Sequence, residues 1–187
     1  MKASQLTRKL TTMAMLTALS IVLVALIHFP LFPAAAFLEY DPADIPVFIG
    51  TFLFGPAAGL LLTLVVSVIQ GTTVSAGSGI IGILMHFLAT GAFAVLAGNI
   101  YKHRRTRVGA MVAIICGVLA MTTVMVLFNL ILTPIFMGVP VEAVIGMLMP
   151  IIIPFNLAKA GINGAITYLV YKPIARMLHH DHPEIVA

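Results

Sequence analysis

The stretch FGPAAG, residues 54–59, decides how many helices this chain contains. It interrupts an apolar run from residue 45 to 70, which without the interruption would be one helix. Pro56 has no backbone N–H to donate, and a proline disfavours the helical conformation in the residue before it, here Gly55. We therefore predict two helices, at 45–54 and 57–71, joined by a tight turn. The alternative is a single kinked helix.

Three basic clusters distinguish these alternatives. They lie near the N-terminus, between two long apolar runs and near the C-terminus: Lys2, Arg8 and Lys9; Lys102, Arg104, Arg105 and Arg107; Lys172 and Arg176. Because such clusters stay cytoplasmic, an even number of crossings must separate neighbouring clusters. A kinked helix would give five crossings and put one cluster outside. We therefore predict six helices with both termini cytoplasmic, at about 9–28, 45–54, 57–71, 79–101, 108–133 and 144–178.

The composition indicates a membrane protein. The 187 residues are 61% hydrophobic and 9% charged, whereas about 25% of the residues of a soluble domain are charged. We predict an all-α integral membrane protein, with residues 1–187 forming one domain in the inner (plasma) membrane. The net charge of +4 comes from clusters that flank helices and does not indicate nucleic acid. The apolar stretch 10–27 is longer than the ~7–15 residues typical of a signal peptide, so we expect a retained helix.

The segment 29–44 before the second helix has the composition of a lid. It carries a run of apolar, aromatic and acidic residues: Phe37, Leu38, Glu39, Tyr40 and Asp41. Prolines at 30, 33 and 42 reduce its flexibility. An external segment of this kind is suited to covering a pocket, although simple solvation is the alternative. We interpret Asp44 separately, as the N-cap of the second helix.

The stretch PFNLAKAGIN, residues 154–163, puts a lysine inside the last apolar run. A lysine at the centre of a membrane helix costs about 2.5–3.5 kcal/mol, so it is rarely there without a function. Asn156, Lys159 and Asn163 are three and four residues apart, which places them on one face of the helix. Asn129, near the outer end of the fifth helix, is expected at a similar depth.

These residues predict an enclosed polar pocket beneath the segment 29–44. We expect Lys159 to donate to a ligand, to Glu39 or Asp41, or to both. Hydrogen bonding between helices is the alternative role of the asparagines, above all Asn163, and a purely structural ion pair is the alternative for Lys159.

Other polar residues have less specific interpretations. Gln70, Thr72 and Thr73 end the third predicted helix on the external side, where they could line the pocket or form an interfacial helix end, which we favour. His86 is interpreted as a hydrogen-bonded interior histidine.

The chain lacks the motifs of an energy-converting enzyme. It contains no G-x-x-x-x-G-K-[ST] phosphate loop and neither H-E-x-x-H nor G-x-S-x-G. We predict no catalytic residues, no metal site and no bound cofactor. A protein that binds a solute without an energy source needs a partner, and Ala14 and Ala18 on the first helix form a small-x-x-x-small element suited to docking one.

These features resemble the substrate-binding S components of energy-coupling-factor (ECF) vitamin transporters, and among them those specific for riboflavin. The resemblance covers nearly the whole chain. It rests on AMLTA (14–18), FLEYDPADIPVFIG (37–50), FGPAAG (54–59), FNLILTP (128–134) and PFNLAKAGIN (154–163), of which the last is the most specific.

The resemblance implies a high-affinity subunit of an ATP-driven importer, with six helices and external capture of riboflavin, possibly also of FMN. It implies that Asn129, Asn156 and Lys159 contact the flavin, and that Ala14 and Ala18 pack on a scaffold membrane subunit that carries two cytoplasmic ATPases. Two alternatives remain open. One is an S component for another vitamin or modified base, and the other is a secondary transporter that uses Lys159 in proton coupling.

Overall fold

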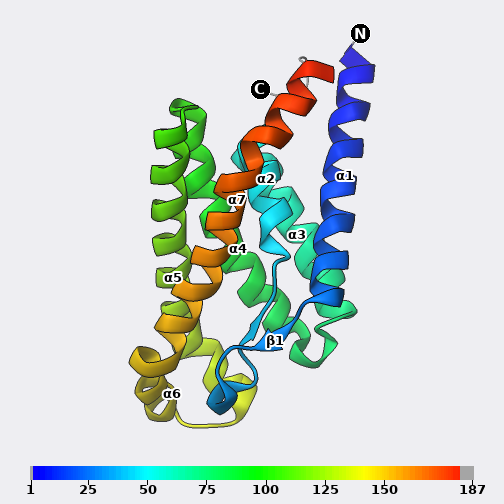
Figure 1. Ribbon diagram of the computed structural model, residues 1–187. Coiled ribbons are helices and arrows are strands. Elements are labelled where there is room, and N and C mark those ends of the chain that lie inside the picture. Colours follow the sequence, from blue (N-terminus) through cyan, green and yellow to red (C-terminus); the bar gives the residue numbers. More distant parts are fainter. Residues whose placement is uncertain (1, 182–187) are drawn as a thin grey trace.

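The computed structural model describes residues 2–181 and is built almost entirely from helices (Figure 1). The helices are α1 (Lys2–Leu26), α2 (Asp44–Phe54), α3 (Pro56–Thr72), α4 (Gly79–His103), α5 (Arg107–Met137), α6 (Val141–Met147) and α7 (Ile153–Asp181). A π-helical segment, Leu148–Ile152, joins α6 to α7. The strands β1 (Phe29–Pro30) and β2 (Glu39–Tyr40) pair antiparallel, and short 3-10 turns occur at Pro33–Ala35 and Ala76–Ser78. The predicted domain also includes residues 1 and 182–187, which lie outside the described part of the chain.

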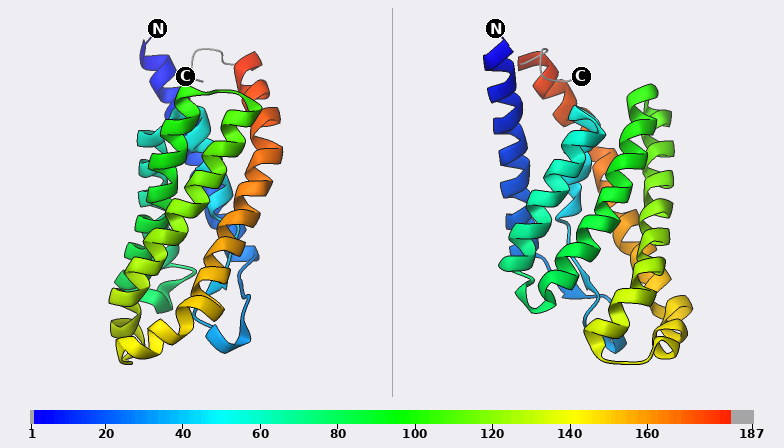
Figure 2. Two further views of the ribbon diagram at one scale, coloured as in Figure 1. Left: turned by 90° about the vertical axis from the view of Figure 1, so that its left-hand side faces the viewer. Right: turned by 180° about the vertical axis from the view of Figure 1, so that it is seen from behind.

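The bundle has two distinct ends (Figures 1 and 2). The first, here called the terminal end, holds the start of α1, the end of α7 and the α4–α5 connection, and therefore the three segments that carry the basic clusters. The second, here called the loop end, holds the segment 27–43, the α3–α4 connection and α6. This arrangement agrees with the parity argument made from the sequence.

The break at Gly55 and Pro56 is confirmed. α2 ends at Phe54 and α3 begins at Pro56, with Gly55 between them at φ 89°. That conformation is costly for residues with a Cβ atom and is readily adopted by glycine. Pro56 occupies the first position of α3, where a missing backbone N–H costs nothing. The stretch therefore contains two helices rather than one kinked helix.

α2 is the central helix of the molecule. All eleven of its residues are buried, and it packs against α1, α3, α4 and α7. The helix is short because the chain reaches its start only after running inward from the loop end as an extended segment. Its neighbours shield it on every side, so α2 does not need the length of a lipid-exposed helix.

The outer helices have the length and composition of membrane spans. Four apolar spans of 18 residues or more occur in the described chain, at Gln5–Leu26, Ala76–His103, Arg107–Met137 and Val141–Met177. α2 and α3 are apolar but shorter. Large apolar side chains are exposed on the outer face of α3, at Leu61, Leu64 and Val68. These faces are suited to contact with lipid.

Three predicted helix bounds are wrong. α1 already begins at Lys2 instead of residue 9. α5 passes through Pro134 and ends one turn later, where Gly138 adopts a left-handed φ of 65°. The predicted helix 144–178 does not start as one regular helix, because α6 and the π-helical segment precede α7. Pro150 lies in the π-helical segment, and a proline removes the N–H that regular helical bonding would need.

The terminal end is filled by aromatic side chains. Phe52 lies between Tyr101 and Tyr171, with ring centroids at 4.6 Å and 5.5 Å, and the two tyrosine rings meet edge to face at 5.7 Å. Phe48 of α2 stacks on Phe93 of α4 with ring centroids 3.5 Å apart. Aromatic packing of this kind fills the space between α2, α4 and α7.

Candidate ligand-binding site

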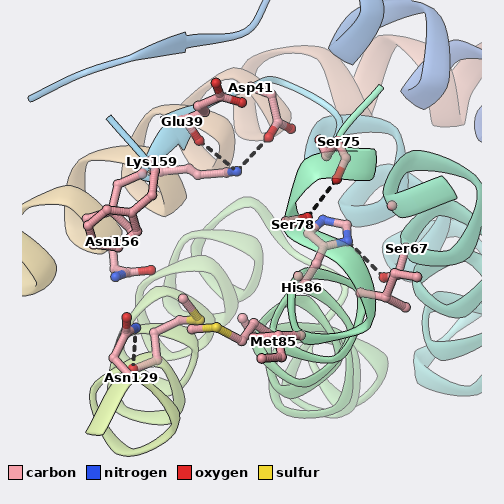
Figure 3. A pocket seen from close by; sticks show the side chains of 18 of the residues that line it. Glu39, Asp41, Ser67, Ser75, Ser78, Met85, His86, Asn129, Asn156 and Lys159 are labelled. Carbon is pink, nitrogen blue, oxygen red and sulfur yellow. Dashed lines mark hydrogen bonds and ion pairs between the residues drawn. The ribbon is translucent and has the colours of Figure 1, made fainter. Parts of the chain in front are cut away.

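A cavity opens at the loop end, between the segment 27–43 and helices α3, α4, α5 and α7 (Figure 3). It leaves about 190 Å³ for the centres of water-sized molecules. Most of the residues predicted to bind a ligand line it together: Phe37, Leu38, Glu39, Asp41, Asn129, Asn156 and Lys159. They come from parts of the chain about 120 residues apart, so their convergence on one cavity supports the predicted pocket.

Lys159 fastens the segment 27–43 to α7. Its Nζ donates to Asp41 Oδ2 at 2.6 Å and to the Glu39 backbone carbonyl at 3.3 Å. The side chain of Lys159 is 12% exposed and that of Asp41 is 5% exposed, so the ion pair is largely removed from solvent. An ammonium group has three N–H donors, which leaves one for a ligand. The structure thus bears out Lys159 as a donor to both residues named from the sequence, with Glu39 contributing its backbone rather than its carboxylate.

Asn129 and Asn156 lie on the same side of the cavity (Figure 3). Asn129 Nδ2 donates to the Met125 carbonyl at 2.7 Å, and its Oδ1 accepts from Thr133 Oγ1 at 2.7 Å. Asn156 Nδ2 donates to the Ile152 carbonyl at 2.8 Å. These bonds fix the orientation of both amides and still leave each with one N–H and acceptor capacity. The pair therefore offers a ligand both donors and acceptors.

Tyr40 and Asn163 lie next to the cavity but do not line it. The Tyr40 hydroxyl donates to Asn163 Oδ1 at 3.1 Å, and Asn163 Nδ2 donates to the Asp41 carbonyl at 3.0 Å. Burial, followed by the nearby Asp41 carboxylate, raises the pKa of the Tyr40 phenol, which therefore stays a neutral donor. Both residues hold the inward-running segment against α7. The interhelical role left open for Asn163 is represented by its contact with Asp44 of α2 at 3.4 Å.

The prediction that Asp44 is the N-cap of the second helix is wrong. Ala43 is the N-cap, and Asp44 is the first residue of α2. Its carboxylate is fully buried and accepts from Thr90 Oγ1 at 2.8 Å, from His86 Nε2 at 3.1 Å and from Asn163 Nδ2 at 3.4 Å. Because α2 starts in the middle of the molecule, its first carboxylate joins α4 to α7 instead of facing solvent.

The opposite side of the cavity was not predicted as a whole. It carries small and polar residues from α3, the α3–α4 connection and α4: Ser67, Gln70, Ser75, Ser78 and His86. His86 is hydrogen-bonded in the interior, as expected, through Ser67 Oγ at 2.8 Å and Asp44. Gln70 lines the cavity, whereas Thr72 and Thr73 are exposed and bond to the backbone of their own helix. In the sequence, Gln70 and Gly71 follow Ser67 by three and four residues. This spacing could have indicated that the three residues share one face of α3.

Methionines form the apolar lining between the two polar sides. Met85, Met121 and Met125 border the cavity from α4 and α5, and Figure 3 shows Met85 between the asparagines and His86. Methionine side chains are flexible and polarizable and adapt well to flat or irregular ligands. The cavity therefore combines a deformable apolar lining with fixed polar groups on two sides.

The segment 27–43 has a second, apolar anchor. Ala35 and Leu38 pack with Val144, Ile152 and Phe155 in a buried cluster at the loop end. The segment is thus held at two places, through this cluster and through the Asp41–Lys159 ion pair. The lid predicted from its composition lies over the cavity between these anchors.

Ala14 and Ala18 lie on the exposed face of α1, while Met13, Leu16 and Ser20 face the interior. The predicted docking element is therefore accessible from outside the bundle. Within the described residues, no three His, Cys, Asp or Glu side chains are placed to hold a metal ion.

The fold and the site together define a helical, multi-pass membrane protein with a cavity at one end. Residues 8–171 match the family model for the substrate-specific component of ECF transporters. The chain belongs to this family. Proteins of this kind are components of transporters and not enzymes.

Named relatives extend over most of the chain. It is 31% identical to riboflavin transporter RibU of Streptococcus thermophilus over 180 residues, which cover 92% of this chain and 85% of that one. It is also 31% identical to riboflavin transporter RibU of Staphylococcus aureus over 185 residues, 93% of this chain and 94% of that one. A solved S component of a bacterial ECF transporter superposes with a TM-score of 0.79 at 31% identity and covers 92% of this chain and 98% of that one.

Proposed function

We propose that this chain is the riboflavin-binding subunit of an ECF-type importer. The observation that carries the proposal is the convergence of Asn129, Asn156 and Lys159 on one cavity beneath the segment 27–43. The 31% identity to proteins named riboflavin transporters supports riboflavin as the ligand.

The chemistry of the cavity is suited to a flavin. Riboflavin is neutral and has a flat ring with an apolar dimethylbenzene edge and an imide edge of alternating acceptors and a donor. The unused N–H and acceptor sites of Asn129 and Asn156 complement that imide edge. Phe37, Leu38 and the methionines would contact the apolar ring. A few converging polar groups in an otherwise apolar cavity are typical of small-molecule sites.

The charge of the cavity favours riboflavin over FMN. Lys159 is the only Lys or Arg among the described residues that line the cavity. Its positive charge is already paired with the Asp41 carboxylate at 2.6 Å. Glu39 adds a second carboxylate. The phosphate of FMN would meet no unpaired ammonium or guanidinium group there, so we propose the neutral flavin as the ligand.

Orientation follows from the basic clusters. All three lie in segments at the terminal end, and the positive-inside rule puts that end in the cytoplasm. The cavity at the loop end would then face outward, and the chain would cross the plasma membrane six times. The lid held by Lys159 and by the apolar cluster would enclose the captured flavin.

Transport would require partners. The chain has no phosphate-binding loop, so ATP hydrolysis would come from two cytoplasmic ATPases attached to a separate scaffold membrane subunit. The exposed Ala14 and Ala18 on α1 would let that scaffold approach closely.

A binding titration tests the ligand assignment. Asn156→Ala and Lys159→Ala should each weaken riboflavin binding at least about tenfold, or 1.4 kcal/mol, because each removes a fixed polar group of the cavity. The measurement is quenching of flavin fluorescence by the purified chain in detergent, with Glu142→Ala at an exposed position as the control. Unchanged affinity in both variants would contradict the site.

Uptake separates binding from docking. Ala14→Trp should leave riboflavin affinity within about twofold and abolish uptake by the complete transporter, because the indole would block close helix packing. Radiolabelled uptake into vesicles containing the scaffold and ATPases measures this, and Leu119→Trp, at an exposed position on α5, is the control. Normal uptake by Ala14→Trp would rule out docking at this face.

A further inference from the structure

The side of the cavity formed by α3 and the α3–α4 connection has hydrogen-bonding capacity that the protein itself does not use. Gln70 lines the cavity and is 8% exposed. Its Oε1 is buried and accepts no hydrogen bond from any residue between 2 and 181. A buried amide oxygen without a partner costs about 1–3 kcal/mol, and a ligand hydroxyl that donated to it would remove that cost.

Ser75 supplies the complementary donor. Gln70 Nε2 donates to Ser75 Oγ across 3.4 Å, which is long for such a bond. That contact occupies the serine oxygen as an acceptor and leaves its O–H free to donate. The last torsion of a glutamine side chain is soft, so the Gln70 amide can turn either of its polar atoms toward a bound molecule. Gln70 and Ser75 together offer one acceptor and one donor.

The other polar residues on this side are already engaged. Ser67 Oγ donates to the Thr63 carbonyl at 2.6 Å and contacts His86 Nδ1, while His86 Nε2 faces Asp44. Ser78 Oγ donates to the Ser75 carbonyl at 2.7 Å. The free capacity is therefore concentrated at Gln70 and Ser75.

The charge on this side excludes an anionic ligand group. Its described lining residues include no Lys or Arg, and the Asp44 carboxylate lies directly behind His86 at 3.1 Å. A phosphate offers mainly acceptor oxygens and negative charge, which suit neither the Gln70 oxygen nor the nearby carboxylate. A hydroxyl group both donates and accepts and carries no charge, so it satisfies both partners.

We propose that Gln70 and Ser75 form a second polar subsite, which binds hydroxyl groups on the ligand's side chain and makes the cavity selective for a hydroxylated ligand. This inference rests on the proposed function, and for riboflavin the group bound would be the ribityl chain. The ring would lie along the methionines, with Asn129 and Asn156 on the opposite side (Figure 3). A site that hydrogen-bonds a hydroxyl discriminates strongly against an analogue that lacks it.

The test compares riboflavin with lumiflavin, which has the same ring and a methyl group in place of the ribityl chain. Gln70→Met keeps the size of the side chain and removes its amide. In the wild type, riboflavin should bind at least about tenfold more tightly than lumiflavin, and Gln70→Met should reduce that preference about fivefold or more. Lumiflavin affinity should stay within about twofold, which also shows that the variant is folded. Thr72→Val, exposed on the same helix, is the matched control and should keep the wild-type preference.

Each outcome has a defined meaning. An unchanged preference in Gln70→Met overturns the subsite, and so does an equal loss of affinity for both flavins, because Gln70 would then act on the ring or on the fold. A wild-type chain that binds neither flavin overturns the proposed function itself, and the subsite with it.

Discussion

The two ends of the molecule differ in how the space between their helices is filled. The loop end encloses a cavity between polar residues, with Asn129, Asn156 and Lys159 on one side and Gln70 and His86 on the other. The terminal end is packed with the rings of Phe52, Tyr101 and Tyr171, whose centroids lie between 4.6 Å and 5.7 Å apart. The loop end therefore has space for a small molecule, whereas the terminal end is closely packed.

This difference favours a binding pocket that is closed toward the terminal end over a channel through the bundle. α2, with every residue buried, lies at the centre of the bundle, and its Phe48 and Phe52 pack against α4 and α7. Along α7, buried polar residues continue from the cavity toward this cluster, but Asn163 and Thr167 are hydrogen-bonded within the protein. A solute held at the loop end would therefore meet closely packed side chains toward the terminal end.

Asp44 lies where the two ends meet, and its removal should have the largest effect. Asp44→Ala leaves His86, Thr90 and Asn163 without their shared acceptor inside the bundle. Breaking a buried network of this kind typically costs about 3–5 kcal/mol. We expect a large drop in thermal stability in detergent together with loss of riboflavin binding. Glu142→Ala, at an exposed carboxylate, should change neither, and a stable Asp44→Ala variant that binds normally would contradict the role of this network.

Phe52 tests whether the terminal end is purely structural. Phe52→Ala removes the ring between Tyr101 and Tyr171 and should destabilise the protein by about 3 kcal/mol through lost packing. Riboflavin affinity of the folded fraction, measured well below its melting temperature, should stay within about twofold. Leu61→Ala, on the exposed face of α3, is the control for losing apolar atoms. A tenfold loss of affinity in Phe52→Ala would mean that the two ends are not independent.

Two buried threonines give the smallest and most closely matched comparison. Thr90 donates to Asp44 at 2.8 Å, whereas the hydroxyl of Thr122 has no hydrogen-bond partner in the described chain. Thr90→Val should destabilise by about 1–2 kcal/mol, and Thr122→Val should be neutral or slightly stabilising. Thermal unfolding of both variants measures the difference. Equal losses of stability in the two variants would show that the hydrogen bond from Thr90 to Asp44 does not itself stabilise the fold.

The sequence was most informative where a polar residue interrupts an apolar run. Lys159 and Asn156 stand out in α7, and Gly55 with Pro56 marks the end of α2. Each of these signals has a large energetic cost that does not depend on the rest of the fold. A charge inside a membrane helix is costly, and a proline lacks the N–H that a continuous helix needs. The division of residues 45–70 into two helices and the cavity residues of α5 and α7 followed from such signals, and Asp41 was among the partners predicted for Lys159.

The sequence was least informative where the role of a residue depends on its position in the folded structure. Asp44 looks like an N-cap because it precedes an apolar helix, and only the inward course of the preceding segment makes it a buried junction. Gln70 looks like part of an interfacial helix end because nothing in its spacing places it across a cavity from α7. Pro134 suggests the end of α5, yet the helix continues one turn to Gly138.

The most direct test of the account is the flavin content of the purified chain. Protein isolated in detergent from cells grown with riboflavin should be yellow, and denaturation should release close to one riboflavin per chain. After the flavin is removed, titration should restore the same stoichiometry and quench flavin fluorescence. A colourless preparation that neither carries riboflavin nor takes it up on titration would contradict the claim that the cavity at the loop end is a flavin site.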